Sequence, residues 1–458
     1  MIHPYSRRDF LRHSGTLLGA LPLSALLGLS APLRAGESED YKALVCVFLE
    51  GGADFFNMIV PRQKTAWEDY EASRGDLAVP RDSLLPLEHA NRSGDNPLLY
   101  GMRGGMRGLQ HLFAEEKLAL IANVGTLVEP VTREDIRNGA PLPQQLYAHN
   151  TQQELWMRGD ARHPHNDGWG GRLADRLVSG AHPWFNLTVG GENLLQSGGR
   201  SEALVFESAV ISTDTMRRYG FGPEAGGGPL GRVYQSLYSR MKSSPHPLMA
   251  ALAKKRMREL RLPDRLSGLF DHVAEFGEFP QGAHETGKPL GEQLKLVAQL
   301  LSVHSAFPGT PRRQLFFVNH HGWDTHDGDN AHQAAYLSES LTAFYRALEQ
   351  LNMTRQVTVL TLSDFGRSLT VNGAGTDHGW GNHAFVLGGA VRGGEIYGVM
   401  PQISPDSPDA WEERMIPTLA AESYLADALR WFGADREDLD AIFPNLHTFG
   451  YDPVGYMA

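Results

Sequence analysis

An apolar run that leads directly into a cluster of histidines and aspartates constrains this chain more than any other stretch. Residues 315–318 have the continuous apolar character of a buried strand, and Gly322 then breaks the extended segment. Residues 319–332, which follow the run, contain four histidines and three aspartates: His320, His321, His326, His332, Asp324, Asp327 and Asp329. Polar side chains at the end of a buried strand are typical of a site at the carboxyl edge of an α/β sheet.

Four further apolar runs predict the rest of a buried sheet. They are residues 43–49, 118–124, 357–362 and 384–389, and their unbroken apolar character suits strands that are covered on both faces. Helical periodicity separates the runs, at residues 104–116 and in a helix with the apolar face Leu337, Leu341, Phe344 and Leu348. This alternation of strands and helices predicts a mainly parallel sheet with right-handed crossovers.

The other stretches give simpler expectations. Short strands are predicted at residues 184–189 and 203–206, and a last helix at 415–434. Residues 230–305 are predicted to be largely helical, and residues 62–100, which are polar and contain prolines, to be irregular surface structure.

Polar side chains also follow two other predicted strands. Asp54 comes after residues 43–49 and a pair of glycines, and Asp364 follows residues 357–362. A third polar segment, residues 375–383, contains His378. Because the carboxyl ends of parallel strands meet at one edge of a sheet, we expect these segments to converge on one metal site.

Histidine and carboxylate ligands without thiolates suit Zn²⁺, Mn²⁺ or a similar divalent ion. Asp324 and His326 would lie on one side of an extended segment and reach the same ion. The predicted ligands are Asp54, Asp324, His326, Asp364 and His378, with Asp54 able to bridge to a second ion and His332 held in reserve. The other members of the histidine- and aspartate-rich cluster are expected to support these ligands or to line the loop. They are His320, His321, Asp327 and Asp329.

Arg367 is predicted to clamp the anionic group of a substrate through its planar guanidinium. Simpler roles are open for these residues as well. Asp54 can cap a turn, a histidine beside an aspartate can be no more than a hydrogen-bonded pair, and Arg367 can pair with a carboxylate.

A helix is also predicted to begin within residues 146–156. His149 or Thr151 would then lie near its N-terminus, where a helix favours anions, so both are candidate catalytic residues. A capping threonine and a half-buried histidine are the alternative.

Composition excludes several classes of protein. The formal net charge of −11 argues against binding to nucleic acid, which requires clustered lysines and arginines. Cys46 is the single cysteine, so neither an intrachain disulfide nor a cysteine-based metal site is available. Its apolar surroundings predict that it packs as a small core residue.

The N-terminus resembles a twin-arginine export signal. Arg7 and Arg8 precede a moderately apolar stretch, and small residues follow at 31–35. Residues 1–35 are therefore predicted to be a signal peptide, which implies passage through the twin-arginine translocase and a periplasmic or secreted protein. An amphipathic N-terminal helix is the alternative. No stable membrane anchor is expected, because no later apolar run is long enough to cross a bilayer.

Five features of the sequence together resemble one bacterial family. They are the twin-arginine start, the Gly-Gly-Ala-Asp segment that ends at Asp54, the Gly-Trp-Asp-Thr-His segment that ends at His326, the Ser-Asp-Phe-Gly-Arg segment that ends at Arg367 and the Gly-Thr-Asp-His-Gly segment around His378. Their order and spacing, over nearly the whole mature chain, are similar to the family called domain of unknown function 1501. The resemblance implies the alkaline phosphatase and sulfatase-like superfamily. It therefore implies one domain over residues 40–450, with a mostly helical insertion around 215–305. Its fold would be a three-layer α/β/α sandwich with a mainly parallel central sheet.

The resemblance further implies an exported metal-dependent hydrolase of phosphate or sulfate esters. One or two divalent ions would bind at the carboxyl edge of the sheet, and the substrate would be a small-molecule or glycan ester. Two positions depart from the superfamily pattern. Ala148 stands where relatives commonly have a serine before His149, which leaves Thr151 as the fallback nucleophile, and Phe365 stands where a histidine usually follows Asp364. A non-catalytic exported protein that binds a glycan or a protein partner is therefore the alternative.

Overall fold

The computed structural model describes most of the chain from Asp40 onward. The described residues are 40–88, 99–163, 165–178, 184–206, 229–254, 269, 273–282, 288–307, 309 and 311–458. Residues Asp40–Ala458 form one unit by their internal contacts. The predicted signal peptide, residues 1–35, and parts of the predicted helical insertion around 215–305 lie outside the described residues.

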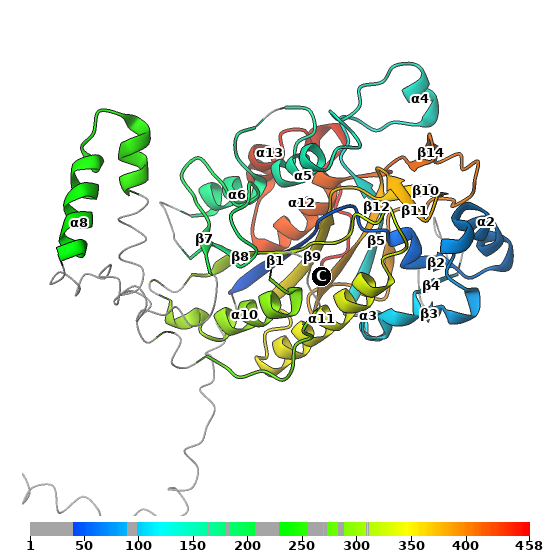
Figure 1. Ribbon diagram of the computed structural model, residues 1–458, viewed down its shortest axis with the longest axis horizontal. Coiled ribbons are helices and arrows are strands. Elements are labelled where there is room, and N and C mark those ends of the chain that lie inside the picture. The colour runs from blue at the N-terminus through cyan, green and yellow to red at the C-terminus, as the bar shows by residue number, and fades with distance from the viewer. Residues whose placement is uncertain are drawn as a thin grey trace, which may run out of the picture. The chain divides into compact units, whose positions relative to one another are not determined.

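A nine-stranded, mainly parallel sheet runs through the middle of this unit (Figure 1). Its order is β13 (Ile396–Tyr397), β5 (Leu118–Gly125), β12 (Asn382–Gly388), β9 (Val357–Ser363), β1 (Lys42–Leu49), β8 (Arg313–His320), β6 (Asn186–Thr188) and β7 (Leu204–Val205), and β16 (Leu419–Ala420) also pairs with β5. At its centre, β1 pairs in parallel with both β8 and β9. Each apolar run that the sequence predicts as a strand lies in this sheet.

Alternate side chains of the central strands face two separate hydrophobic cores. In β1, Val45 and Val47 pack into one core, whereas Leu44 and Cys46 pack into the other. Both faces of the sheet are therefore buried, which explains why its strands are continuous apolar runs in the sequence. Burial raises the pKa of the Cys46 thiol, in keeping with a cysteine that packs as a small core residue.

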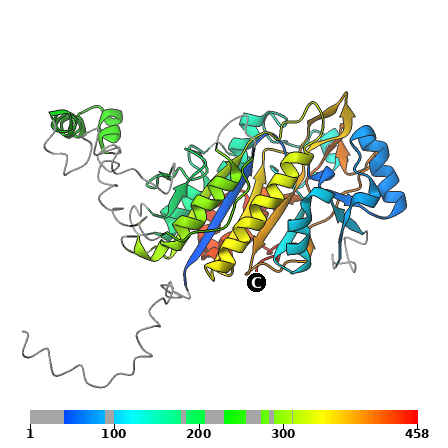
Figure 2. The ribbon, with the colours of Figure 1, turned by 60° about the horizontal axis from the view of Figure 1, so that its bottom comes forward.

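Helices cover both faces of the sheet and give the fold three layers. On one face lie α3 (Arg107–Ala114), α10 (Leu290–Ser302) and α11 (Ala331–Gln350), with α10 and α11 side by side (Figure 2). On the other face lie α5 (His149–Arg158), α6 (Trp169–Leu177), α12 (Ala421–Phe432) and α13 (Arg436–Ile442). The architecture is the α/β/α sandwich that the sequence resemblance implies.

Two further helices are α4 (Arg133–Arg137) and α8 (Pro229–Lys242), the second of which lies in the region predicted to be helical. The helix predicted at 415–434 begins only at Ala421, because β14 (Ala410–Trp411), β15 (Arg414–Met415) and β16 pair as short strands before it. In the part of the chain that the structure describes, no helix has the length and apolar character that crossing a bilayer requires.

The strand β12 runs antiparallel to both of its neighbours, β5 and β9. It therefore begins at the edge where the parallel strands end. Asn382, its first residue, donates hydrogen bonds from Nδ2 to the carbonyl oxygens of Ala53 (2.9 Å) and Phe365 (3.1 Å). The start of β12 thus ties the loop after β1 to the loop after β9.

Residues 62–100 are more regular than the sequence predicts. They contain α2 (Lys64–Arg74), and β3 (Leu85–Leu87) and β4 (Tyr100–Met102) form a small sheet with β2 (Ile59–Pro61). The prediction of irregular structure is therefore wrong for the described part of this stretch. The prediction fails because α2 buries only Tyr70, Ser73 and Arg74. The helix therefore lacks the apolar stripe that would reveal it in the sequence.

Candidate metal centre

Four segments meet at the carboxyl edge of the sheet. The strands β1, β8 and β9 end side by side, because Leu49 is in register with both His320 and Ser363. The loops that follow β8 and β9 carry Asp324 and Asp364. A hairpin of β10 (Arg367–Asn372) and β11 (Gly375–His378) contributes His378, and α5 contributes its first residue, His149.

The two ring nitrogens of His149 have different surroundings: Nδ1 contacts Asp364, and Nε2 faces His378 and Asp324. Its Nδ1 lies 2.7 Å from Oδ2 of Asp364, a buried carboxylate. Because an ionised carboxylate only accepts hydrogen bonds, Nδ1 carries a proton. Nε2 of His149 then faces Nε2 of His378 at 3.1 Å and Oδ2 of Asp324 at 3.4 Å.

His378 is oriented in the same way by a backbone group. Its Nδ1 lies 2.7 Å from the carbonyl oxygen of Tyr147, which can only accept, so this nitrogen also carries a proton. The lone pair of Nε2 therefore points toward His149 and toward Oδ1 of Asp324, at 3.4 Å.

Asp324 and His326 complete the cluster. Nε2 of His326 lies 3.0 Å from Nε2 of His378 and 3.1 Å from Oδ1 of Asp324. On its far side, Nδ1 of His326 is 3.6 Å from Oδ1 of Asp377. Asp324 is itself held by Arg367, whose Nη1 donates to Oδ1 at 2.9 Å.

These donor atoms suit a divalent cation. One ligand atom each from His149, Asp324 and His378 lie within 4.8 Å of one another. Two unprotonated imidazole nitrogens that face each other at 3.1 Å repel, so a proton or a metal ion has to lie between them. Imidazole nitrogens with a carboxylate are typical zinc ligands, and an oxygen partner on Nδ1 is the usual way in which a metal-binding histidine is held.

Burial and charge shift the pKa values of the cluster. Burial lowers the pKa of His378. Burial would also lower the pKa of His149, but the hydrogen bond and charge of Asp364, with the charge of Asp324, raise it above the ordinary 6.5. Burial opposes ionisation of Asp324, yet the hydrogen bond from Arg367 and the nearby positive charges lower its pKa. In the absence of an ion, protonation is therefore favoured at His149 over His378.

A glycine turn after β1 supports both carboxylates. The amide nitrogen of Gly51 lies 3.2 and 3.3 Å from the two oxygens of Asp364. Gly51 has φ +117°, and a Cβ at this position would lie 2.4 Å from the backbone nitrogen of Asp324. The turn therefore requires glycine for its φ and for the space.

We expect Gly51→Ala to destabilise the fold and to weaken metal binding, because the strained backbone alone costs about 1–3 kcal/mol and the new methyl group displaces Asp324. Gly139→Ala is the matched control, since Gly139 also has positive φ (+89°) but a Cβ there would have no atom within 4 Å. Thermal unfolding and a metal titration of both variants make the test. Equal effects of the two substitutions would contradict the role of the close approach at Gly51.

Arg367, the predicted anion clamp, is fully buried. Besides its bond to Asp324, its Nη1 donates to the carbonyl oxygen of Gly51 at 3.2 Å, and its Nε donates to Oγ1 of Thr376 at 3.1 Å. The structure therefore places its guanidinium among protein acceptors, where it holds Asp324 against the glycine turn.

Two other predicted site residues lie outside the group of donor atoms. The Thr151 hydroxyl donates to Oε1 of Gln145 at 2.6 Å. The Asp54 carboxylate is buried and accepts two hydrogen bonds from Arg74, at 2.9 and 3.0 Å. The structure thus brings together ligand atoms of His149, Asp324 and His378. His326 lies beside His378 and Asp324, and Asp364 lies behind His149.

The remaining residues of the histidine-rich loop lie around this group. His320 is buried against Trp323 and Tyr336, His321 pairs with Glu50, Asp329 pairs with Arg103, and Asp327 and His332 are exposed. These contacts brace the loop that presents Asp324.

Sequence reasoning missed one residue of the site, Gln153, and the partner of the predicted ligand Asp54, Arg74. Gln153 donates from Nε2 to Oδ2 of Asp364 at 3.0 Å, on the same carboxylate oxygen that His149 contacts. Its spacing of four from His149 on a predicted helix could have indicated it, because residues four apart share one helix face. Arg74 carries no such signal, since it comes from a helix that the sequence pattern does not reveal.

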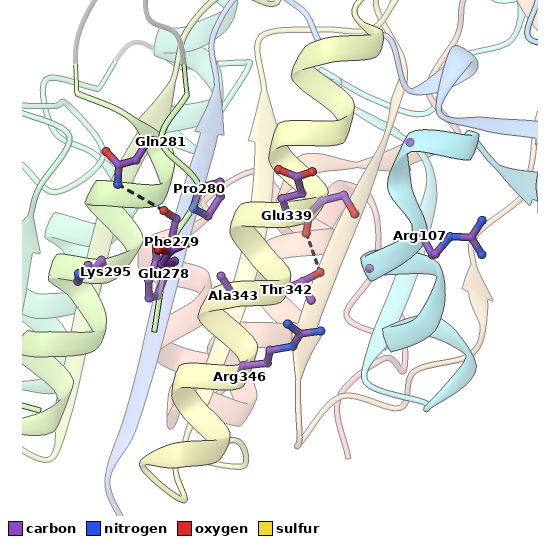
Figure 3. Close-up of a pocket in the computed structure, with 13 residues that line it drawn as sticks. Arg107, Glu278, Phe279, Pro280, Gln281, Lys295, Glu339, Thr342, Ala343 and Arg346 are labelled. Atoms are coloured by element: carbon purple, nitrogen blue, oxygen red, sulfur yellow. Dashed lines mark hydrogen bonds between the residues drawn. The ribbon is translucent and has the colours of Figure 1, made fainter. Parts of the chain in front are cut away.

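An open cavity of about 770 Å³ lies elsewhere, between α3, α10 and α11 (Figure 3). It shares no residue with the cluster around Asp324. Its wall carries charges of both signs: Arg107, Lys295, Arg346, Glu278 and Glu339. A surface of such mixed charge does not select a ligand by charge.

Several solved structures are similar to the chain at low identity. The crystal structure of Ps i-CgsB in complex with k-i-k-neocarrahexaose is 8% identical, covers 90% of this chain and 77% of that chain, and has a TM-score of 0.35. The C-terminal periplasmic domain of EcEptC from Escherichia coli, in complex with Zn, is 9% identical, with coverages of 88% and 87% and a TM-score of 0.33. The PsFucS1 sulfatase from Pseudoalteromonas sp. is 10% identical, with coverages of 87% and 68% and a TM-score of 0.33.

Among curated proteins, no sequence matches the chain. A family model does match part of it, and the matched part includes Asp324, His326, Asp364 and His378. Residues 310–422 match the family described as protein of unknown function (DUF1501), which confirms the resemblance for the three motifs that lie in this part of the chain, those around Asp324, Asp364 and His378.

Proposed function

We propose that this protein is an exported, metal-dependent hydrolase of phosphate or sulfate esters. The observation that carries the proposal is the convergence of two imidazole nitrogens, from His149 and His378, on the carboxylate of Asp324. Each of the two rings is held through Nδ1 by an oxygen atom. When bound there, a divalent ion such as zinc or manganese supplies Lewis acidity toward an ester oxygen and lowers the pKa of a water molecule.

The other residues of the centre have supporting roles in this proposal. Asp364 and the carbonyl group of Tyr147 fix the two ligand rings, and Arg367 fixes Asp324. The Phe365 ring packs against His149 and His378, with centroid distances of 4.8 and 4.9 Å. It forms an apolar wall that excludes water from one side of the centre. In this proposal His326 flanks the centre, with its Nε2 3.0 Å from Nε2 of His378 and 3.1 Å from Oδ1 of Asp324.

The residues at the start of α5 favour direct attack by water. Ala148, at the N-cap of α5, has no side-chain oxygen, and the Thr151 hydroxyl is bonded to Gln145. Neither position therefore supplies a hydroxyl nucleophile to the centre. An ion in the centre would supply an activated water as the nucleophile instead.

The proposals for export and for the substrate class do not depend on the geometry of the centre. Arg7 and Arg8 with the apolar stretch behind them support passage through the twin-arginine translocase into the periplasm or the medium. A small-molecule or glycan ester is the substrate class that suits an exported hydrolase. The lack of a hydroxyl at Ala148 and the aromatic ring at Phe365 favour one rival: a non-catalytic exported protein that binds a glycan or a protein partner.

Metal analysis and turnover separate the two functions. The mature chain is purified, its metal content is measured, and hydrolysis of 4-nitrophenyl phosphate and 4-nitrophenyl sulfate is followed before and after treatment with a chelator. We expect a bound divalent ion, turnover of at least one ester, loss of turnover with the chelator and recovery with zinc or manganese. A folded chain with neither metal nor metal-dependent turnover would falsify the hydrolase proposal and favour the rival.

Metal affinity is expected to fall on acidification. A metal ion and a proton compete for Nε2 of His149, because Nδ1 already carries a proton toward Asp364. The raised pKa of His149 means that its proton begins to compete at a higher pH than for an ordinary histidine with a pKa of 6.5. Affinity is therefore highest above the raised pKa and is lost as the pH falls through it. Titrations against a competing chelator between pH 5 and 9 measure this, and an affinity independent of pH would contradict His149 as a ligand.

A further inference from the structure

Asp54, the predicted ligand that could bridge to a second ion, already has a cationic partner. Nη1 of Arg74 donates to its Oδ2 at 3.0 Å, and Nη2 donates to its Oδ1 at 2.9 Å. The side chain of Arg74 is 0% exposed and that of Asp54 is 4% exposed. Both carboxylate oxygens are therefore engaged by one guanidinium, in a bidentate pair that water does not reach.

A divalent ion could bind Asp54 only against the charge of Arg74. Arginine keeps its positive charge in proteins, and buried charges are screened much less than exposed ones. Moving the guanidinium away would leave a buried charge without its partner, and it also lies over the Phe56 ring, 5.7 Å from the centroid. Arg74 thus neutralises Asp54 in the way that a metal ion would.

Phe365 contributes no ligand atom beside Asp364. It directly follows Asp364, and its ring stacks on His378 with an interplanar angle of 29°. On its other side the ring approaches the glycine turn, since a Cβ on Gly52 would lie 2.6 Å from it. An aromatic ring offers no ligand atom, and this ring fills the space between the histidines and the turn.

We propose that the centre holds a single divalent ion on His149, Asp324 and His378, and that Arg74 is a fixed cation in the place of a second ion. This inference rests on the proposed function for the presence of an ion and adds the number of ions.

The number of ions per chain tests the proposal. The mature chain is stripped with a chelator, reloaded with Zn²⁺, freed of excess metal and examined by native mass spectrometry and by elemental analysis. We expect one ion per chain. A chain that binds no ion overturns the proposed function together with this inference, whereas a second ion at Asp54 overturns this inference and leaves the proposed function intact.

The double variant Asp54→Asn/Arg74→Gln locates any second ion. It removes both charges with little change in size, so no buried charge is left unpaired. We expect the ion count of the wild type and an affinity within about threefold of it, since loss even of a group that supports a ligand costs about 10–100-fold. A folded double variant, as judged by circular dichroism, that loses an ion or more than about tenfold in affinity overturns the inference. Asp324→Asn is the positive control and is expected to lose the ion. If the double variant does not fold, the number of ions bound by the wild type decides: one ion supports the inference and two overturn it.

Discussion

Replacing Asp324 by asparagine will lower the affinity for a divalent ion by more than about 100-fold, beyond the range expected for residues that only support a ligand, and ester hydrolysis will fall with it. The carboxylate lies within 3.4 Å of Nε2 of both His149 and His378, so it is the anionic member of the donor group. Asparagine keeps the shape but loses the charge, and it leaves the buried Arg367 without an ionic partner. A titration against a chromogenic chelator measures the affinity, and kcat/KM on an aryl ester measures the hydrolysis.

Asp377→Asn is the matched control for Asp324→Asn. Asp377 is similarly exposed, at 40% against 44%, but it lies on the far side of His326, 3.6 Å from Nδ1. We expect its neutralisation to reduce metal affinity by less than about tenfold, the lower end of the range for groups that support a ligand. Equal losses in the two variants would mean that the overall negative charge around the centre, rather than ligation by Asp324, governs binding. An unchanged affinity in Asp324→Asn would remove this aspartate from the ligand set.

Replacing Arg74 by alanine will reduce the free energy of unfolding by about 3–5 kcal/mol, because it leaves the buried Asp54 carboxylate without its counter-charge. The cost arises mainly from the stranded carboxylate, since neither side chain reaches water. Urea unfolding of the metal-free protein measures the change and keeps it separate from any effect of an ion. A loss below about 1 kcal/mol, the value of an exposed ion pair, would contradict the buried pair.

Two further variants show where the stability of the pair comes from. Arg312→Ala breaks an exposed pair, with Asp40, whose side chains are 76% and 55% exposed, and it is expected to cost less than about 1 kcal/mol. The variant Asp54→Asn/Arg74→Gln removes both buried charges at once. It should unfold at a higher urea concentration than Arg74→Ala, because no unpaired charge remains.

The layers of the fold could be predicted from the sequence because burial on both faces produces a plain signal. Residues 43–49 alternate between two cores, so every position is apolar and the strand is visible as a run. The direction of β12 could not be predicted in this way, since an antiparallel strand that is buried on both faces shows the same run as a parallel one. The helix α2 could not be predicted either, because it buries only three residues.

The residues of the candidate site that could be predicted from the sequence mainly follow the ends of predicted strands. Polar residues in the segments after strands β8 and β9 indicate Asp324 and Asp364, and both contact His149 in the structure. Partners depend on tertiary packing, which no local pattern records. Asp54 has the same position after β1, yet α2 places Arg74 on its carboxylate. The sequence predicts His149 as a catalytic residue at a helix start, and the packing of α5 places its Nε2 among the donor atoms of the cluster.

The separation of His149 and His378 along the chain has a consequence for folding and export. These two residues are 229 positions apart, so an ion held between them acts as a cross-link between the two halves of the sequence. A ligand that binds only the folded state raises stability in proportion to the logarithm of its concentration over its Kd. Under the proposed export by the twin-arginine route, the protein folds before it leaves the cytoplasm. On that proposal, the metal supply of the cytoplasm, rather than that of the compartment to which the protein is exported, determines which ion it carries.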